Sequence, residues 1–268
     1  MALTTLAAVN AALPGQVVPI TKSTTGGGAG NWYGLWALAG SPVGALPSSG
    51  LSGNVPTSAT AGGVPFVNPT APALTYLARV TGSGIGATSA QSTYFSIYDR
   101  LWQNSGLSST LITAQTVNSV ALTRPDALGA GVEAWWQVYA AMGAGTPTVT
   151  LSYTDQDGTA GNSASSGALG SAMAIRLAGQ FTLAAGDTGV RSIQSWTASA
   201  TFTSGTIGLV LRRHVAAFAL LNVSLVTQLD AVALGLPRVY DSACLEVMMN
   251  PATGFNVGPN LALSLVQG

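Results

Sequence analysis

Apolar and polar residues alternate with a period of two along several segments of the chain after residue 73. Val149, Leu151 and Tyr153 alternate with threonine and serine, so one face of this segment is apolar and the other is hydroxylated. The same alternation recurs in three further segments: Leu74, Tyr76, Ala78 and Val80; Val132, Ala134, Trp136 and Val138; and Leu261, Leu263 and Leu265. The pattern therefore predicts several half-buried antiparallel strands.

Turn residues separate these segments. Asp157-Gly158 follows the strand at 149–153, and Ser204-Gly205 precedes another alternating segment at 207–211. Short strands with such turns favour an antiparallel β-sandwich or jelly-roll-like body with little helix. The best helix candidate in the second half is Leu225–Leu236, which Pro237 would end.

Residues 1–72 have a different composition, rich in Gly, Pro, Ser, Thr and Ala. This part buries too little apolar surface to fold alone, so we expect an extended N-terminal arm at 1–72 and a β-sandwich body at 73–268. The arm nevertheless contains Trp32, Tyr33 and Trp36, whose large rings are worth burying. We expect them to order the arm on its own body or on a neighbouring subunit.

Charge is scarce in this chain. Charged residues make up 7% of the sequence, the formal net charge is zero, and Lys22 is the single lysine. Surfaces with little charge tend to associate, which favours an assembly subunit over a freely diffusing enzyme. The sequence shows no basic stripe for nucleic acid, no signal peptide and no membrane-spanning segment, so we expect neither nucleic acid nor a membrane as a partner.

Residues that commonly act in catalysis or bind metals are also scarce. His214 is the only histidine and Cys244, in an apolar segment, is the only cysteine, which argues against catalytic triads, disulfides and the usual zinc sites. Asp155-Gln156-Asp157-Gly158 resembles the start of a calcium loop but lacks the later ligands, so we interpret it as a hairpin turn. We therefore predict no enzyme activity, catalytic residue, cofactor or metal.

Trp135-Trp136 could present a ring to a sugar. Neighbouring strand residues face opposite sides, so at most one ring serves a given surface. We expect one ring in the core and the other at an interface. The predicted interface residues are Trp32, Tyr33, Trp36 and Trp135.

Four segments resemble a recurring virion protein of tailed bacteriophages. They are Tyr98–Gly106 (YDRLWQNSG), Thr113–Ser119 (TAQTVNS), Ser152–Gly161 (SYTDQDGTAG) and Ala185–Ser195 (AGDTGVRSIQS). The resemblance implies a place in the virion and supplies no catalytic residues. This chain has Asn162 after the third segment, where an arginine is common in the family.

Together these features favour a non-enzymatic virion structural protein made in the host cytoplasm. We expect a capsid decoration or cement protein that binds the outer head shell, forms a dimer or trimer with itself, and contacts the major capsid protein or another virion protein. Two alternatives remain open: a tail, baseplate or fibre component, and a carbohydrate-binding β-sandwich module. An enzyme would instead require a pocket that gathers Asp155, Asp157 or Glu133.

Overall fold

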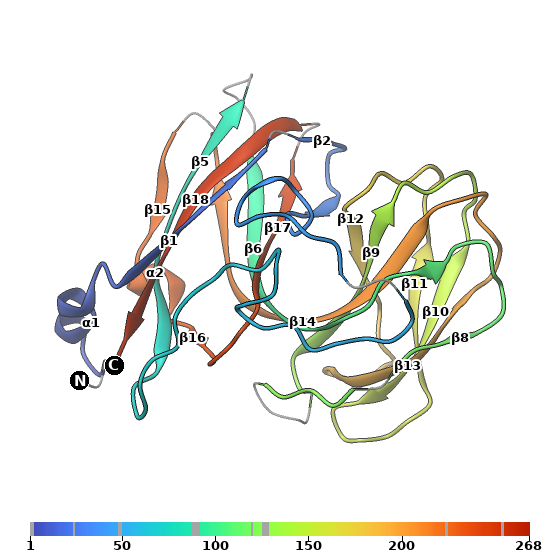
Figure 1. Cartoon of the computed structure of the whole chain (residues 1–268), viewed down its shortest axis with the longest axis horizontal. Helices are drawn as coiled ribbons and strands as arrows, with labels where there is room; N and C mark the ends of the chain where they lie inside the picture. The colour runs from blue at the N-terminus through green and yellow to red at the C-terminus, as the bar shows by residue number, and fades with distance from the viewer. Residues whose placement is uncertain are drawn as a thin grey trace. The chain divides into compact units, whose positions relative to one another are not determined.

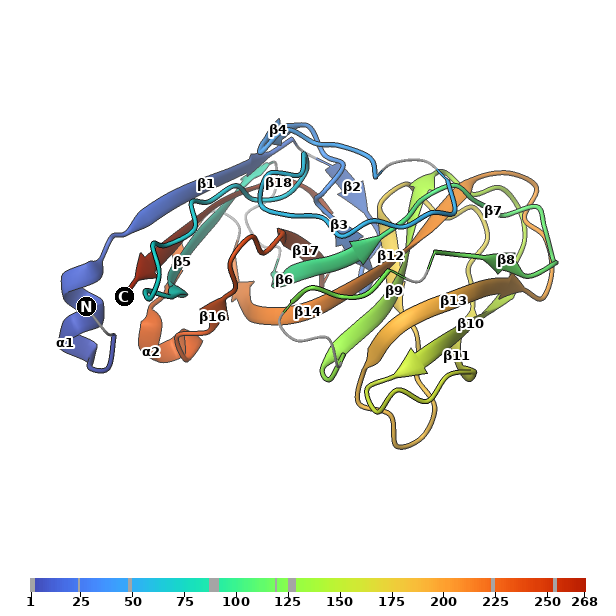
Figure 2. The same cartoon turned by 60° about the horizontal axis from the view of Figure 1, so that its bottom comes forward.

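The structure is a computed structural model, and it describes residues 3–23, 25–47, 50–86, 92–118, 120–124, 129–222, 225–252 and 255–268. Ser119, in one of the segments quoted above, lies outside these residues. The fold is mainly β with antiparallel strand pairing, which confirms the predicted fold class (Figures 1 and 2). The described helices are short.

The contacts divide the chain into two compact units. Unit 1 contains Met1–Ala45, Thr57–Asp99 and Val215–Gly268, and unit 2 contains Leu46–Pro56 and Arg100–His214. Boundaries between the two units fall within two long strands, β6 (Thr93–Gln103) and β14 (Thr206–Leu220).

Unit 1 is built on a sheet with strand order β15-β5-β18-β1-β4, to which β16 adds beside β5 and β2 beside β18. Its strands are β1 (Gln16–Lys22), β2 (Thr25–Gly27), β4 (Gly40–Ser41), β5 (Thr75–Gly86), β15 (Thr227–Leu229), β16 (Arg238–Val239) and β18 (Phe255–Gln267). Leu261, Leu263 and Leu265 of β18 are buried, as the alternation predicts. On one side β18 pairs with β5, and on the other with β1.

Two short helices accompany this sheet. Helix α1 (Leu6–Ala12) begins at Thr5, whose hydroxyl accepts a hydrogen bond from the Ala8 N–H at 3.1 Å. Helix α2 (Ala231–Leu234) is capped by Asp230, and it ends at Gly235 in the left-handed conformation. The predicted helix over Leu225–Leu236 is wrong in extent, because β15 occupies part of it.

The remaining strands of unit 1 are β3 (Trp32–Gly34) and β17 (Leu245–Pro251). Strand β17 pairs with β3 and with β6. Phe95 of β6 stacks on Phe218 of β14 with ring centroids 5.2 Å apart. Phe218 also lies against Gly82 of β5, where an added Cβ would be 3.2 Å from its ring, so this stack packs on the main sheet of unit 1.

Unit 2 encloses one large apolar core. One sheet has the order β11-β10-β13-β8, and the other strands follow the order β12-β9-β14-β7. The bounds are β7 (Leu107–Ser108), β8 (Gln115–Thr116), β9 (Val132–Ala140), β10 (Thr148–Asp155), β11 (Asn162–Ala168), β12 (Leu177–Gln180) and β13 (Val190–Ala198). Leu151 and Trp196 from the first sheet share a buried cluster with Trp136 and Leu209 from the second.

The alternation pattern is confirmed in β10 and incomplete in β9. In β10, Val149, Leu151 and Tyr153 are buried while Thr150 is exposed. In β9 both faces are buried, since Trp135 is covered as well as Trp136. Alternation identified this strand but did not reveal that its second face is buried.

The predicted arm packs on other parts of the same chain. Strand β1 pairs with β18, β3 pairs with β17, and Asn54 forms a bridge with Gln103. The division into an arm at 1–72 and a body at 73–268 concerns which part folds alone, and it stays a prediction.

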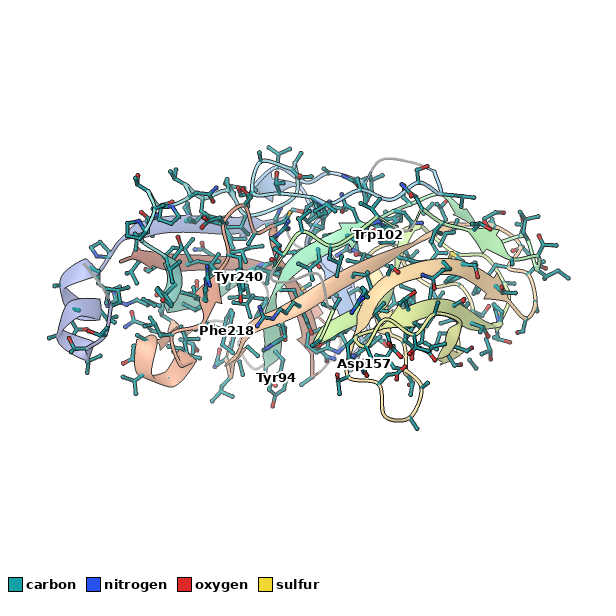
Figure 3. All side chains as sticks on the ribbon, turned by 90° about the horizontal axis from the view of Figure 1, so that it is seen from below. Tyr94, Trp102, Asp157, Phe218 and Tyr240 are labelled. Carbon is teal, nitrogen blue, oxygen red and sulfur yellow. The ribbon has the colours of Figure 1, made fainter. Side chains whose placement is uncertain are left out.

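Glycines let the arm approach two tryptophan rings. A Cβ added to Gly53 would lie 1.9 Å from Cζ2 of Trp102, which is labelled in Figure 3. A Cβ added to Gly62 would lie 2.5 Å from Cε2 of Trp36, and Gly62 also has a positive φ of 97°. Both backbones therefore lie against indole rings at a distance that only glycine permits.

We expect Gly53→Ala to lower the free energy of unfolding by about 1–3 kcal/mol, because the new methyl group must displace the buried Trp102 ring. Gly170→Ala is the matched control, since its added Cβ meets only Met173 Cγ at 3.9 Å. Chemical denaturation monitored by tryptophan fluorescence would measure both variants. Equal stabilities for the two would contradict the close contact.

Candidate interaction surfaces

The structure buries most of the aromatic residues that we predicted for an interface. Tyr33 is 3% exposed, Trp36 1% and Trp135 2%, while Trp32 is partly exposed. A direct interface role for the three buried rings would require another conformation. The interface assignment stays a prediction, and Trp32 is its most accessible member.

Trp135 and Trp136 offer no exposed ring for a sugar. Trp136 belongs to the core of unit 2. Trp135 lies on the other face of β9, where the Arg212 guanidinium lies 4.9 Å from the centroid of the Trp135 ring. The indole N–H of Trp135 donates to Glu133 Oε2 at 2.7 Å. A carbohydrate site built on these two rings is therefore not present in this conformation.

The segment 155–158 forms a tight turn between β10 and β11. Asp155 Oδ1 accepts hydrogen bonds from the N–H groups of Asp157 and Thr159, each at 2.9 Å, and Oδ2 accepts one from the Asn162 amide at 2.9 Å. Burial alone would raise the pKa of Asp155, but these hydrogen bonds outweigh it and hold the pKa below its ordinary value.

This network confirms the hairpin-turn interpretation of the acidic motif. The Asp155 carboxylate anchors the backbone of its own turn, while Asp157 lies on the exposed part of the turn (Figure 3). Asn162 supplies a side-chain donor to Asp155. The turn is thus held by neutral donors around the Asp155 carboxylate and by the Arg191 guanidinium, which donates to the Gln156 carbonyl oxygen at 2.9 Å.

A hydroxyl-rich face covers the four-stranded sheet of unit 2. Thr150 on β10 lies opposite Ser165 on β11 and Thr197 on β13. Ser152 lies likewise opposite Ser163 and Ser195. These six residues are exposed or partly exposed, so this face offers many neutral hydrogen-bonding groups.

An apolar groove lies between the two helices of unit 1. We call it the α1–α2 groove: a hollow of about 240 Å³ lined by Leu3, Thr4, Thr5, Leu6, Val9, Ala231, Val232 and Leu236. Its lining carries no charged side chain. Leu6 is 56% exposed and Val232 69%, whereas Val9 is buried.

Sequence reasoning missed this groove, although a signal was present. Leu6, Val9 and Leu13 follow the helix-capping residue Thr5 at helical spacing, within the predicted extended arm. Helix α2, with four residues, is too short for periodicity to reveal. A second hollow, of about 490 Å³, lies nearby and includes Leu3, Leu74 and Tyr76.

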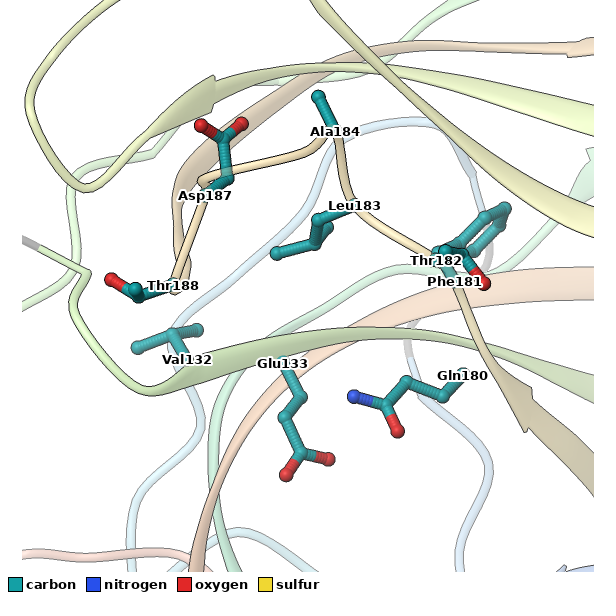
Figure 4. Close-up of a pocket in the computed structure, with 9 residues that line it drawn as sticks. All are labelled: Val132, Glu133, Gln180, Phe181, Thr182, Leu183, Ala184, Asp187 and Thr188. Carbon is teal, nitrogen blue, oxygen red and sulfur yellow. The ribbon is translucent and has the colours of Figure 1, made fainter.

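A polar cavity of about 410 Å³ lies in unit 2, lined by Val132, Glu133, Gln180, Phe181, Thr182, Leu183, Ala184, Asp187 and Thr188 (Figure 4). Glu133 lines this cavity, whereas Asp155 and Asp157, the other two carboxylates that we considered for an enzyme site, do not. The expectation that the chain is not an enzyme stays a prediction.

The single lysine is buried in unit 1. Lys22 is 4% exposed, and its ammonium donates to the carbonyl oxygens of Leu38, at 3.2 Å, and Pro42. Burial lowers the pKa of Lys22 to about 8. The ammonium therefore ties β1 to the segment that follows β3, in the predicted arm.

The remaining candidate catalytic or metal-binding residues are not part of these surfaces. Cys244 is fully buried, as predicted, and His214 is exposed on β14. Within the described ranges, no group of three or more His, Cys, Asp or Glu could hold a metal ion. The described helices include none that is long and apolar enough to cross a membrane.

Comparisons with known proteins give distant likenesses only. No family model matches the chain, and no curated protein matches it. Among solved structures, the crystal structure of the infectious bursal disease virus VP2 subviral particle is 9% identical, with 94% of this chain and 80% of that chain covered and a TM-score of 0.25.

Two related structures give similar values. The structure of the Gt strain of the same virus is 10% identical over 94% of this chain and 80% of that chain, with a TM-score of 0.21. The structure of T=1 particles derived from infectious bursal virus is 10% identical over 94% of this chain and 77% of that chain, with a TM-score of 0.22. At these TM-scores the likeness carries no argument about fold or function.

We expect Asp155→Asn to lower the melting temperature more than Asp157→Asn does, because Asp155 accepts from several donors of the turn, whereas Asp157 accepts only from the Gln156 amide among the residues that the structure describes. The pKa of Asp155 is depressed on folding, so its contribution is present above the ordinary aspartate pKa and is lost as pH falls through the folded-state value. The difference between the two variants should therefore shrink in acid. Thermal melts at neutral and acidic pH would measure it, and equal melting temperatures at neutral pH would argue against the anchor.

We expect the stability of the chain to rise as pH increases from about 8 toward 10.5, because the folded-state pKa of Lys22 is lowered to about 8 from 10.5. In that window the unfolded state binds more protons than the folded state, which favours folding as pH rises. Lys22→Met should remove this component of the pH dependence. Urea unfolding across the window would measure it, and an unchanged slope in the variant would show that Lys22 is not its source.

Proposed function

We propose that this chain is a non-enzymatic structural subunit of a virus particle, a capsid decoration or cement protein that binds the outer head shell. The α1–α2 groove contacts a neighbouring virion subunit. The observation that carries this proposal is the exposure of Leu6 and Val232 on either side of a groove whose lining has no charge. Aliphatic side chains around a hollow of this kind favour a protein partner that covers them.

The use of charge supports the same proposal. The chain has nine basic and nine acidic residues, and seven of those that the structure describes are buried: Lys22, Asp99, Arg100, Arg124, Asp155, Arg212 and Glu246. The exterior is therefore poorer in charge than the composition alone indicates. Such an exterior gives little electrostatic repulsion between copies and suits close packing in an assembly.

The hydroxyl-rich face and the phage resemblance add to this account. Serine and threonine on a sheet face can form hydrogen bonds to a neighbour without the cost of removing charges from water. The four resembling segments support a tailed-phage virion as the setting. In such a particle many equivalent copies act together, so modest contacts at each copy stabilise the shell.

The proposal predicts that Val232→Glu lowers incorporation into particles by about tenfold or more, because a buried charge at the contact would cost at least the roughly 1.4 kcal/mol that corresponds to tenfold in affinity. Val43→Glu is the matched control, since Val43 is 73% exposed and Val232 69%, and Val43 does not line the α1–α2 groove. Quantitative mass spectrometry of purified particles, with heads and tails separated, would count copies of each variant.

Normal incorporation of Val232→Glu would contradict the role of the groove. Recovery of the unaltered chain in tails would replace the decoration role with a tail or baseplate role. Absence of the unaltered chain from particles would overturn the virion proposal itself. Circular dichroism of the purified variants would confirm that each one folds.

A further inference from the structure

We propose that the polar cavity of unit 2 binds a neutral saccharide unit. We call it the β9–β12 cavity, because Glu133 comes from β9 and Gln180 from the end of β12. Its volume of about 410 Å³ lies in the range of small-molecule sites. The inference does not depend on the virion role, because the cavity shares no residue with the α1–α2 groove.

Strand pairing places the main polar groups on one face. Gln180 is opposite Trp135 in the β9–β12 register, and Glu133 lies two residues from Trp135 on the same strand. Residues two apart on a strand share a face, so the Glu133 and Gln180 side chains project from the same side. Figure 4 shows their polar ends close together at one side of the cavity.

These groups retain hydrogen-bonding capacity. Glu133 Oε2 accepts from the Trp135 indole N–H, and its Oε1 accepts from no other group in the described ranges. The Gln180 side chain is exposed at the end of β12, so its amide is accessible to a ligand. The Trp135 contact fixes the carboxylate orientation and leaves one of its oxygens available to a ligand.

The opposite rim is held in place by hydrogen bonds. The Tyr153 hydroxyl donates to Asp187 Oδ2 and accepts from the Ala184 N–H at 2.9 Å. Burial, followed by the hydrogen bond to Asp187, raises the pKa of Tyr153 to about 12, so the hydroxyl stays a donor. The side-chain oxygen of Gln156 accepts from the N–H groups of Thr188, at 3.0 Å, and Gly189, at 3.2 Å.

A rim fixed in this way loses little conformational entropy when a ligand binds. Leu183 projects from it between the polar groups of the two sides (Figure 4). The cavity thus combines an aliphatic surface with carboxylate, amide and hydroxyl groups. This combination suits a sugar ring, whose C–H groups are apolar and whose hydroxyls are polar.

The lining also discriminates against other ligands. The lining itself contains no lysine or arginine, so a phosphate, sulfate or acidic sugar would meet the carboxylates of Glu133 and Asp187 there. The guanidinium of Arg212, opposite Glu133 on β14, stacks on the Trp135 ring and does not line the cavity. A guanidinium or ammonium group only donates hydrogen bonds, and it would leave the donor side of the Gln180 amide unmatched. A sugar hydroxyl both donates and accepts, so neighbouring hydroxyls can serve the carboxylate and the amide together.

The test is NMR titration of the full isotope-labelled chain with glucose, galactose, mannose, N-acetylglucosamine and maltose, and separately with arginine methyl ester. We expect at least one saccharide to bind with a dissociation constant on the order of millimolar. The shifted amides should include residues 132–133 and 180–188. Gln180→Ala and Glu133→Gln should each weaken binding by about tenfold, as expected for the loss of one charge-assisted or amide hydrogen bond.

Gln228→Ala is the matched control, because Gln228 is also exposed on a strand but lies on β15 in unit 1. Its affinity should equal that of the unaltered chain. Absence of saccharide-induced shifts at these residues, or unchanged affinity in Gln180→Ala, would overturn the proposal. Shifts there with arginine methyl ester alone would assign the cavity to a cationic ligand and would overturn it as well.

Discussion

Close contact between glycine backbone and tryptophan rings is the constraint on which the ordering of the N-terminal segment depends. Gly62 lies against Trp36 and Gly53 against Trp102, so glycine provides flat surfaces for large rings. A third contact of this kind joins Gly179 of β12 to Trp136, with an added Cβ 2.4 Å from Cζ2. Glycine is entropically costly to order, and burial of a large indole offsets that cost.

Several charged side chains also stabilise the interior of the chain. Buried ionisable groups such as Lys22 and Asp155 hold backbone carbonyl or N–H groups, and so they serve the interior of the chain. What remains outside is largely hydroxyl, amide and aliphatic. A chain with such an exterior gains stability when neighbours cover it, which links the internal use of charge to the proposed role in an assembly.

The sequence predicted the parts of the fold in which local pattern and tertiary environment agree. Strand β10 is the clearest case, since its hydroxyl face is accessible and its apolar face lies in the core. The Asp155 turn was also predictable, because aspartate and glycine there favour one local conformation. In these segments a few neighbouring residues determine the structure.

Prediction failed where distant segments decide the structure. Alternation along β9 does not reveal that its second face is buried, because the Trp135 ring on that face is covered by Arg212, a residue far away in sequence. The interface assignment of Trp135 itself stays a prediction. The segment Leu225–Leu236 has helical composition, yet pairing of β15 with β5 takes part of it into a sheet. The β9–β12 cavity gathers Glu133, Gln180 and Asp187 from separate segments, and no spacing in the sequence marks it.

The most direct test of the central claim is a cryo-EM map of virus particles purified from cells that produce this chain. The account predicts repeated copies on the outer face of the head, with the α1–α2 groove covered by a neighbouring subunit. A map with copies on the head and the groove open to solvent would contradict the proposed contact. A particle without the chain would contradict the central claim itself.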